Sequence, residues 1–271
     1  MKAPRIFHLS RTRRFSFARA LVSATFLLAP AALCAQDAIP AGTVLPVRLN
    51  DSLSSQKSKP GQIITARVMQ DVPLDQGKKV SAGSKVVGHV VEIIPASDSA
   101  RARISLKFDT VVSSGHSIPI VTSLRALASL GEIDEAQIPL YGGDRGTPSS
   151  AYQNTQIGGE IVYRGGGHVM AGGHVVGEPA PNGVLSRLRP NPEGSCRGAM
   201  DENNQLQALW LFSSDACGVY GYPHLKIVKA GRRNPAGEIE LAADSGDVKI
   251  RSGSGLLLRV VGSDSSNQDA S

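Results

Sequence analysis

Short apolar segments that alternate with polar residues and end at turn residues constrain the fold of this chain most strongly. They are rich in Val and Ile, and Pro-Gly, Ala-Gly or Ser-Gly pairs separate them. Because the side chains of a strand alternate between two faces, such segments predict antiparallel strands with a buried face. In the N-terminal half these expected strands are Thr43–Leu49, Ile63–Gln70, Lys85–Ile94, Arg103–Val112 and Ser117–Val121.

Strand-like segments return further along the chain. Their alternation is interrupted by glycine-rich stretches, but the Val and Ile content is similar. We therefore expect a mainly β fold, an antiparallel β-barrel or sandwich. The later candidates are Glu160–Tyr163, His174–Val176, Ala208–Phe212, Leu225–Lys229, Glu238–Leu241, Val248–Ile250 and Leu256–Val261.

One segment has helical spacing. Leu124, Leu127 and Leu130 recur every three residues, which predicts a short helix over Ser123–Ala136. The polar, glycine-rich stretch Tyr141–Gly183 follows, and we interpret it as loops and an extended hairpin. Together they form a glycine-rich irregular insertion over residues 123–193.

The N-terminus has the three parts of a secretory signal. A basic region ends at Arg19, an apolar stretch runs over Ala20–Leu33, and small residues precede Gln36. The apolar stretch is shorter than the about 20 residues that span a bilayer, so no transmembrane span is expected in the mature chain. An uncleaved anchor is the alternative, and Arg13-Arg14 leaves twin-arginine export open beside the general route.

The positive charge belongs to this leader. Six of the 29 Lys and Arg residues precede residue 36, where no Asp or Glu occurs, so the remaining 23 basic residues balance 23 acidic ones. A mature chain with a formal net charge of zero lacks the excess of basic residues that is typical of nucleic-acid-binding proteins. We therefore expect no nucleic-acid partner.

The expected organisation follows from these patterns. Residues 1–35 are the signal peptide, 36–122 the N-terminal part of the barrel, and 194–262 the C-terminal part that closes it. Residues 263–271 are a polar tail.

Two cysteines, Cys196 and Cys217, remain after the expected cleavage. Thiols tend to pair in oxidising compartments, so we predict one disulfide that staples a small β unit. A metal pair is the weaker alternative, because neither cysteine has a Cys-x-x-Cys partner or a histidine at short spacing.

An aromatic block lies beside the second cysteine. It contains Trp210, Phe212, Tyr220 and Tyr222, half of the eight aromatic residues that follow the signal. Exposed rings of this kind stack on sugars, so a partner or ligand patch is one interpretation. The other is that Trp210 and Phe212 lie on one face of a strand and form the core of the stapled unit.

Several strand entries, taken as an ordered set, resemble one family. They are Ile39–Leu49 (IPAGTVLPVRL), Pro60-Gly61-Gln62, Ala66-Arg67-Val68, Gln70-Asp71-Val72 and Ala82–Gly88 (AGSKVVG). The set resembles the C-terminal β-barrel domain of TrbI-like proteins, the conjugation and type IV secretion core-complex subunits.

This resemblance implies that Thr43–Leu49 and Leu256–Val261, the opening and closing strands of a barrel, are neighbours in one sheet. The chain differs from the family in having Ser81-Ala82 where Pro-Gln is usual. It also shows no proline-rich spacer and no apolar helical pair between Ser123 and Ser195. Small β-clip domains of flagellar and pilus assembly chaperones have a similar Pro-Ala-Gly entry and are an alternative source of the same residues.

The sequence lacks several motifs of catalytic and cofactor chemistry. The sequence has no His-Glu-x-x-His and no Gly-x-Ser-x-Gly motif, and no Lys-Ser or Lys-Thr pair follows the glycines at 165–167. Gly172-Gly173 would interrupt any strand that placed His168 and His174 on one face. We therefore expect no catalysis, no metal site and no cofactor.

The functional expectation combines these points. We expect an exported protein of the periplasm or outer envelope, a TrbI-like scaffold or assembly component. Its expected partners are envelope proteins or a second copy of itself. The alternative is a secreted glycan- or peptidoglycan-binding module that uses the Trp210 and Tyr222 block.

Overall fold

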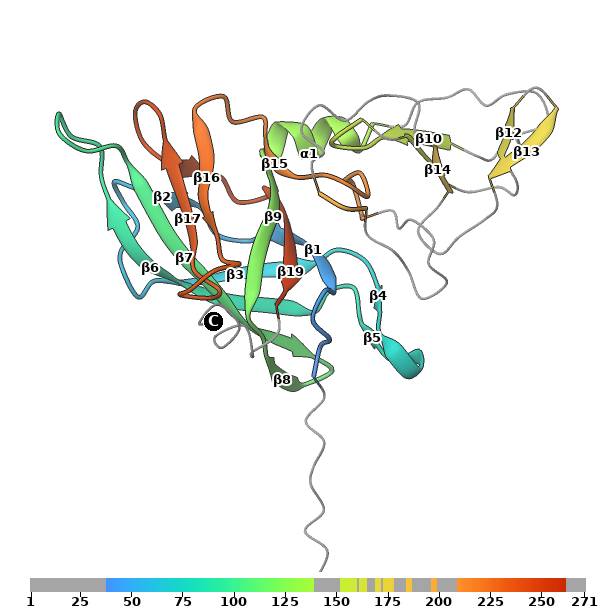
Figure 1. Ribbon diagram of the computed structural model, residues 1–271, viewed down its shortest axis with the longest axis horizontal. Helices are drawn as coiled ribbons and strands as arrows, with labels where there is room; N and C mark the ends of the chain where they lie inside the picture. The colour runs from blue at the N-terminus through green and yellow to red at the C-terminus, as the bar shows by residue number, and fades with distance from the viewer. Residues whose placement is uncertain are drawn as a thin grey trace, which may run out of the picture. The chain divides into compact units, whose positions relative to one another are not determined.

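The computed structural model describes residues 38–138, 152–159, 161–164, 169–171, 173–177, 184–186, 196–198 and 209–261 (Figure 1). The fold is mainly β with one α-helix, as the alternating segments predicted. The expected signal peptide, the polar tail, His168 and the glycines at 165–167 lie outside the described residues.

Ten strands form one large sheet, hydrogen-bonded in the order β15-β9-β19-β1-β3-β6-β7-β17-β16, with β8 paired to β7. All its neighbours are antiparallel except β15 and β9, which are parallel. Its strands are β1 (Val44–Leu49), β3 (Ile63–Val68), β6 (Lys85–Ile94), β7 (Arg103–Ser113), β8 (His116–Pro119), β9 (Thr122–Ala128), β15 (Gly218–Tyr220), β16 (Leu225–Ala230), β17 (Ile239–Ala243) and β19 (Gly255–Val260).

Shorter elements complete the fold. The pairs β2–β18 and β4–β5 are antiparallel ribbons, β10, β11 and β14 form a three-stranded sheet, and β12 and β13 form a hairpin. The hairpin confirms the one expected within Tyr141–Gly183, and Ala171 lies opposite His174 in it. The bounds are β2 (Leu53–Ser54), β4 (Val72–Pro73), the 3-10 turn η1 (Asp75–Gly77), β5 (Lys79–Val80), α1 (Leu130–Ala136), β10 (Tyr152–Thr155), β11 (Ile161–Arg164), β12 (Val169–Ala171), β13 (His174–Gly177), β14 (Val184–Ser186) and β18 (Lys249–Ile250).

The opening and closing strands are neighbours, which confirms the expected pairing. In the β1–β19 ladder Val44 lies opposite Arg259 and Arg48 lies opposite Gly255. The sheet also curls back on itself, because the Thr122 hydroxyl of β9 donates to the Phe108 carbonyl of β7 at 3.0 Å although four strands separate them in the sheet order. Among the described strands no ladder joins β15 to β16, so no closed barrel is shown, and a sandwich fits.

Two apolar clusters stabilise this arrangement. The larger one fills the inside of the curled sheet with residues such as Leu45, Ile64 and Phe108. The smaller one, called cluster 2 here, lies on the opposite face of β1, β9 and β19 and contains Phe212 and Leu257. β1, β9 and β19, which contact both clusters, are therefore buried on both faces, whereas β3 and β6 have one buried face and alternate.

The predicted helix over Ser123–Ala136 is wrong in its first half. Residues 122–128 form β9, and the helix covers only Leu130–Ala136. The cause is a β-bulge: Leu257 pairs with Ala126 and Leu258 with Leu124, so the residue between them has no opposite partner. A bulge shifts the alternation by one residue and places Leu124 and Leu127 on the same side, which imitates helical spacing.

The bulged residue is Arg125, which is buried. Its Nε donates to the Ala216 carbonyl at 3.0 Å, and its Nη2 donates to the Ser214 carbonyl. Burial and, to a smaller extent, the positive charge of Arg259 lower the pKa of the guanidinium to about 10. These bonds fix the loop that leads into Cys217.

The predicted strand Ala208–Phe212 is also wrong in the part that the structure describes. Leu209 and Phe212 form isolated bridges, and the Phe212 amide donates to the Leu209 carbonyl at 2.9 Å, which closes a turn. Trp210 in this turn has a positive φ of 56°. Leu209, Leu211 and Phe212 are all buried, so the apolar run marks a turn folded into cluster 2 rather than a strand.

The predicted disulfide is confirmed. Cys196 and Cys217 are bonded, with their Cα atoms 5.5 Å apart. No helix within the described ranges is long and apolar enough to cross a membrane.

Candidate functional site

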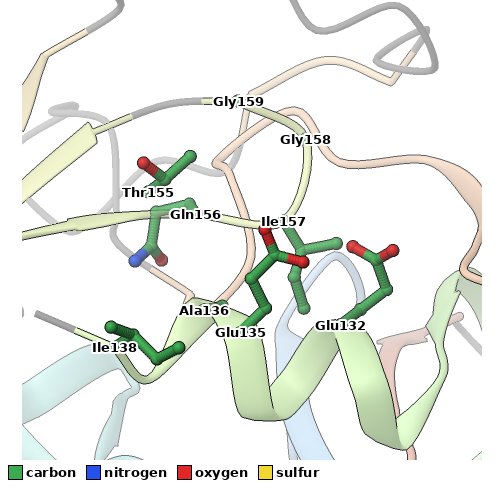
Figure 2. A pocket seen from close by; sticks show the side chains of 9 residues that line it. All are labelled: Glu132, Glu135, Ala136, Ile138, Thr155, Gln156, Ile157, Gly158 and Gly159. Atoms are coloured by element: carbon green, nitrogen blue, oxygen red, sulfur yellow. The ribbon is translucent and has the colours of Figure 1, made fainter.

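A cavity of about 280 Å³ lies between α1 and the segment that follows β10 (Figure 2). Its lining comes from the C-terminal part of the helix and from a glycine turn of the insertion. The lining residues are Glu132, Glu135, Ala136, Ile138, Thr155, Gln156, Ile157, Gly158 and Gly159.

The orientation of α1 decides which of its side chains face the cavity. Ser129 caps the helix by accepting a hydrogen bond from the Glu132 amide at 3.3 Å. Ile133 and Ala136 are buried in cluster 2 and hold one face of the helix against the sheet. Figure 2 shows the carboxylates of Glu132 and Glu135 pointing from the helix towards the segment 155–159.

The opposite wall is held by hydrogen bonds to two distant parts of the chain. Asn154 Nδ2 donates to the Ala136 carbonyl at 3.2 Å, which ties β10 to the end of α1. The Ile157 amide donates to the Leu211 carbonyl at 2.8 Å, and the Ser213 amide donates to the Ile157 carbonyl at 2.9 Å. These hydrogen bonds join the cavity wall at Ile157 to the turn over residues 209–212, which carries Phe212.

A glycine turn shapes the rim of this wall. The Gly159 amide donates to the Gln156 carbonyl at 2.8 Å, and Gly158 and Gly159 have φ values of 106° and 99°. Residues with a Cβ rarely adopt such angles, so the turn requires glycine at these positions.

Gln156 is the unusual residue of the site. Its side chain is only 2% exposed, yet neither its Oε1 nor its Nε2 has a hydrogen-bond partner among the described residues. In Figure 2 its amide points towards the C-terminal end of α1, on the cavity side. Buried side-chain amides are normally paired, so an unpaired one at a cavity wall marks a place where a polar ligand can bind.

The charge of the site is negative. Burial raises the pKa of Glu132, and the negative charge of Glu135 raises it further. None of the nine described lining residues is basic, so no cationic partner of the carboxylates is found in the described part of the cavity wall. The arrangement therefore favours a ligand that brings positive charge and hydrogen-bond donors.

The four aromatic residues of the expected patch do not form one exposed surface. Phe212 and Tyr220 are buried in cluster 2, with Trp210 packed half-buried against them. Tyr222 contacts the larger cluster instead, and its hydroxyl lies 2.8 Å from Ser254 Oγ. Burial raises the pKa of Tyr222. This geometry favours the core interpretation of the block.

The described histidines lie apart from the cavity. His89 Nδ1 lies 3.0 Å from Asp109 Oδ2 across β6 and β7, and His116, His174 and His224 are exposed. In the described ranges no three His, Cys, Asp or Glu side chains are grouped so that they could hold a metal ion.

Sequence reasoning missed this cavity. Ser129 and Glu132 have the spacing of a helix capping motif and could have located the start of α1. No local signal marks Gln156, because its burial comes from the contacts of Ile157 with residues more than fifty positions later.

No protein-family model matches the chain, and no curated protein matches it in sequence.

Proposed function

We propose that the protein is an exported, non-catalytic component of the cell envelope that works in assembly or scaffolding through protein contacts. The proposal extends to this chain the role of the TrbI-like subunits that its strand entries resemble. It places the protein in the periplasm or at the outer envelope.

The observation that carries the proposal is the antiparallel pairing of β1 with β19. The resemblance implies that the opening and closing strands are neighbours, which the alternation of each strand does not by itself determine. Because residues more than two hundred positions apart form this ladder, the pairing is not a consequence of local sequence.

Two further features support the proposal. The Cys196–Cys217 disulfide is compatible with an oxidising compartment. The described surface also exposes three large apolar side chains, Ile63, Ile138 and Val228, each more than half accessible. Single exposed apolar residues are common, but these give defined positions at which contact with a partner can be probed.

Chemical cross-linking in the native cell tests the proposal. The full chain, with an affinity tag after Ser271, would be treated with formaldehyde, and its adducts would be captured from separated cell fractions. We expect the chain in the envelope fraction in discrete adducts with envelope proteins or with itself. A variant without residues 1–35 is the control and should give neither. Wild-type protein found only in the cytoplasm, or without adducts, would contradict the proposal.

A further inference from the structure

The cavity beside α1 brings together groups that the fold alone does not explain. Glu132 and Glu135 direct two carboxylates towards the segment 155–159, and the buried amide of Gln156 has no partner among the described residues. A core position of this size would be more stable with an apolar side chain, because an unpaired buried amide loses its hydration without compensation. Glu132, Glu135 and Gln156 all line one cavity.

We propose that this cavity binds an arginine side chain of a partner protein, with the guanidinium between the carboxylates of Glu132 and Glu135 and the amide of Gln156. The inference rests on the proposed function, since the arginine belongs to a protein with which the chain assembles.

The chemistry of the walls selects this ligand. A guanidinium has five N–H donors in one plane and no acceptor, so it can donate to both carboxylates and to Gln156 Oε1 together. Gln156 Nε2 remains as a donor for a backbone carbonyl of the same peptide. Ala136, Ile138 and Ile157 supply an apolar wall on which the methylene stem of an arginine can pack.

Other ligand classes fit less well. Among the described lining residues an anion would meet two carboxylates and no basic side chain, and a sugar would find no aromatic ring. A divalent cation would find two carboxylates and no third acidic, His or Cys ligand in the part of the lining that the structure describes. The volume, about 280 Å³, is room for one long side chain.

Isothermal titration of the purified exported protein with capped tripeptides tests the inference. The probes are Ala-Arg-Ala, Ala-Lys-Ala and Ala-citrulline-Ala, in which citrulline has the shape of arginine without its charge. We expect saturable binding of the arginine peptide alone. Glu135→Gln should weaken it by about fivefold or more, the loss of one partly shielded ion pair of about 1 kcal/mol.

Two further variants distinguish loss of the binding site from general changes in surface charge or in folding. Glu92→Gln makes the same chemical change at an exposed position of β6 and should leave binding unchanged. Gln156→Leu should weaken binding while keeping or raising the melting temperature, so a lost fold cannot account for the loss. No saturable binding, equal binding of the lysine or citrulline peptide, or unchanged binding by Glu135→Gln would overturn the inference.

The cross-linking experiment distinguishes failure of the arginine site from failure of the proposed function. Envelope adducts that persist in Glu135→Gln, together with absent peptide binding, would remove the arginine site and leave the proposed function in place. Absence of all adducts would contradict the proposed function itself.

Discussion

Truncation of Phe212 to alanine should lower the free energy of unfolding by about 4 kcal/mol. Its side chain is 0% exposed within cluster 2. The ring lies against Gly255 of β19 so closely that a Cβ there would meet it at 3.1 Å. Phe→Ala changes in cores cost about 3–5 kcal/mol, from lost burial and from the cavity that remains. We expect the middle of this range, since backbone hydrogen bonds of Leu209, Leu211 and Ile157 restrict collapse around the ring.

Urea denaturation followed by circular dichroism measures this change. Two controls make it specific: Phe212→Leu keeps an apolar side chain and should cost well under half as much, and Trp210→Ala removes a half-buried ring. Trp210→Ala should therefore cost less than Phe212→Ala. A loss below about 1 kcal/mol for Phe212→Ala, typical of an exposed site, would refute the placement of this ring in the core. A larger loss of unfolding free energy for Trp210→Ala than for Phe212→Ala would refute this placement as well.

Four further predictions concern stability. Gly88→Ala should cost about 1–3 kcal/mol in urea denaturation, because its Cβ would overlap a carbonyl oxygen of β7; a change within the error of the fit would contradict this. Reduction of the disulfide, which links residues 21 positions apart, should cost about 3 kcal/mol, and an unchanged melting temperature in reductant would contradict it. The hydrogen bond from Lys79 lowers the pKa of Asp71, so this carboxylate stabilises the fold above its unfolded-state pKa and loses its effect as the pH falls through the lowered folded-state pKa. The melting temperature of Asp71→Asn should accordingly lie below that of wild type at pH 7, with a gap that closes in acid; a constant gap would count against the ion pair. Gln156→Leu should stabilise the free protein by about 1–3 kcal/mol by removing an unpaired buried amide, and destabilisation would show that the amide has a partner in solution.

The sequence was sufficient to locate the strands in which one face is buried. β6 has the predicted bounds Lys85–Ile94, and β3 and β7 differ from their predictions only at the ends. Period-two alternation is a direct consequence of strand geometry, so it survives wherever one face meets the core. The pairing of β1 with β19 could be expected only through the resemblance, because alternation does not determine which strands are neighbours.

The misplaced helix has a specific physical cause. The bulge at Arg125 adds one residue between Leu124 and Leu127, and the spacing of three that results is the same as in a helix. β9 is also buried on both faces, so its polar residues Thr122, Ser123 and Arg125 do not mark an exposed side. The sequence alone does not distinguish a bulged strand from a helix here. The bulge at Arg125 depends on the carbonyls of Ser214 and Ala216, which are distant in the sequence.

The candidate site depends on contacts between distant segments. Gln156 is buried because Ile157 is bonded to Leu211 and Ser213, and the acidic residues of α1 face it because Ile133 is held in cluster 2. Each residue alone is unremarkable in sequence. Only the fold brings two carboxylates and an unpaired amide to one cavity.

Site-specific photo-cross-linking in the native cell tests the central claim, that the exported protein acts through protein contacts. A photoreactive amino acid would replace, one at a time, the exposed residues Ile63, Ile138 and Val228. We predict ultraviolet-dependent adducts with an envelope protein or a second copy of the chain, strongest at Ile138 on the rim of the cavity. If none of the three positions gives an adduct in cells where the protein is exported and its disulfide is formed, the claim is contradicted.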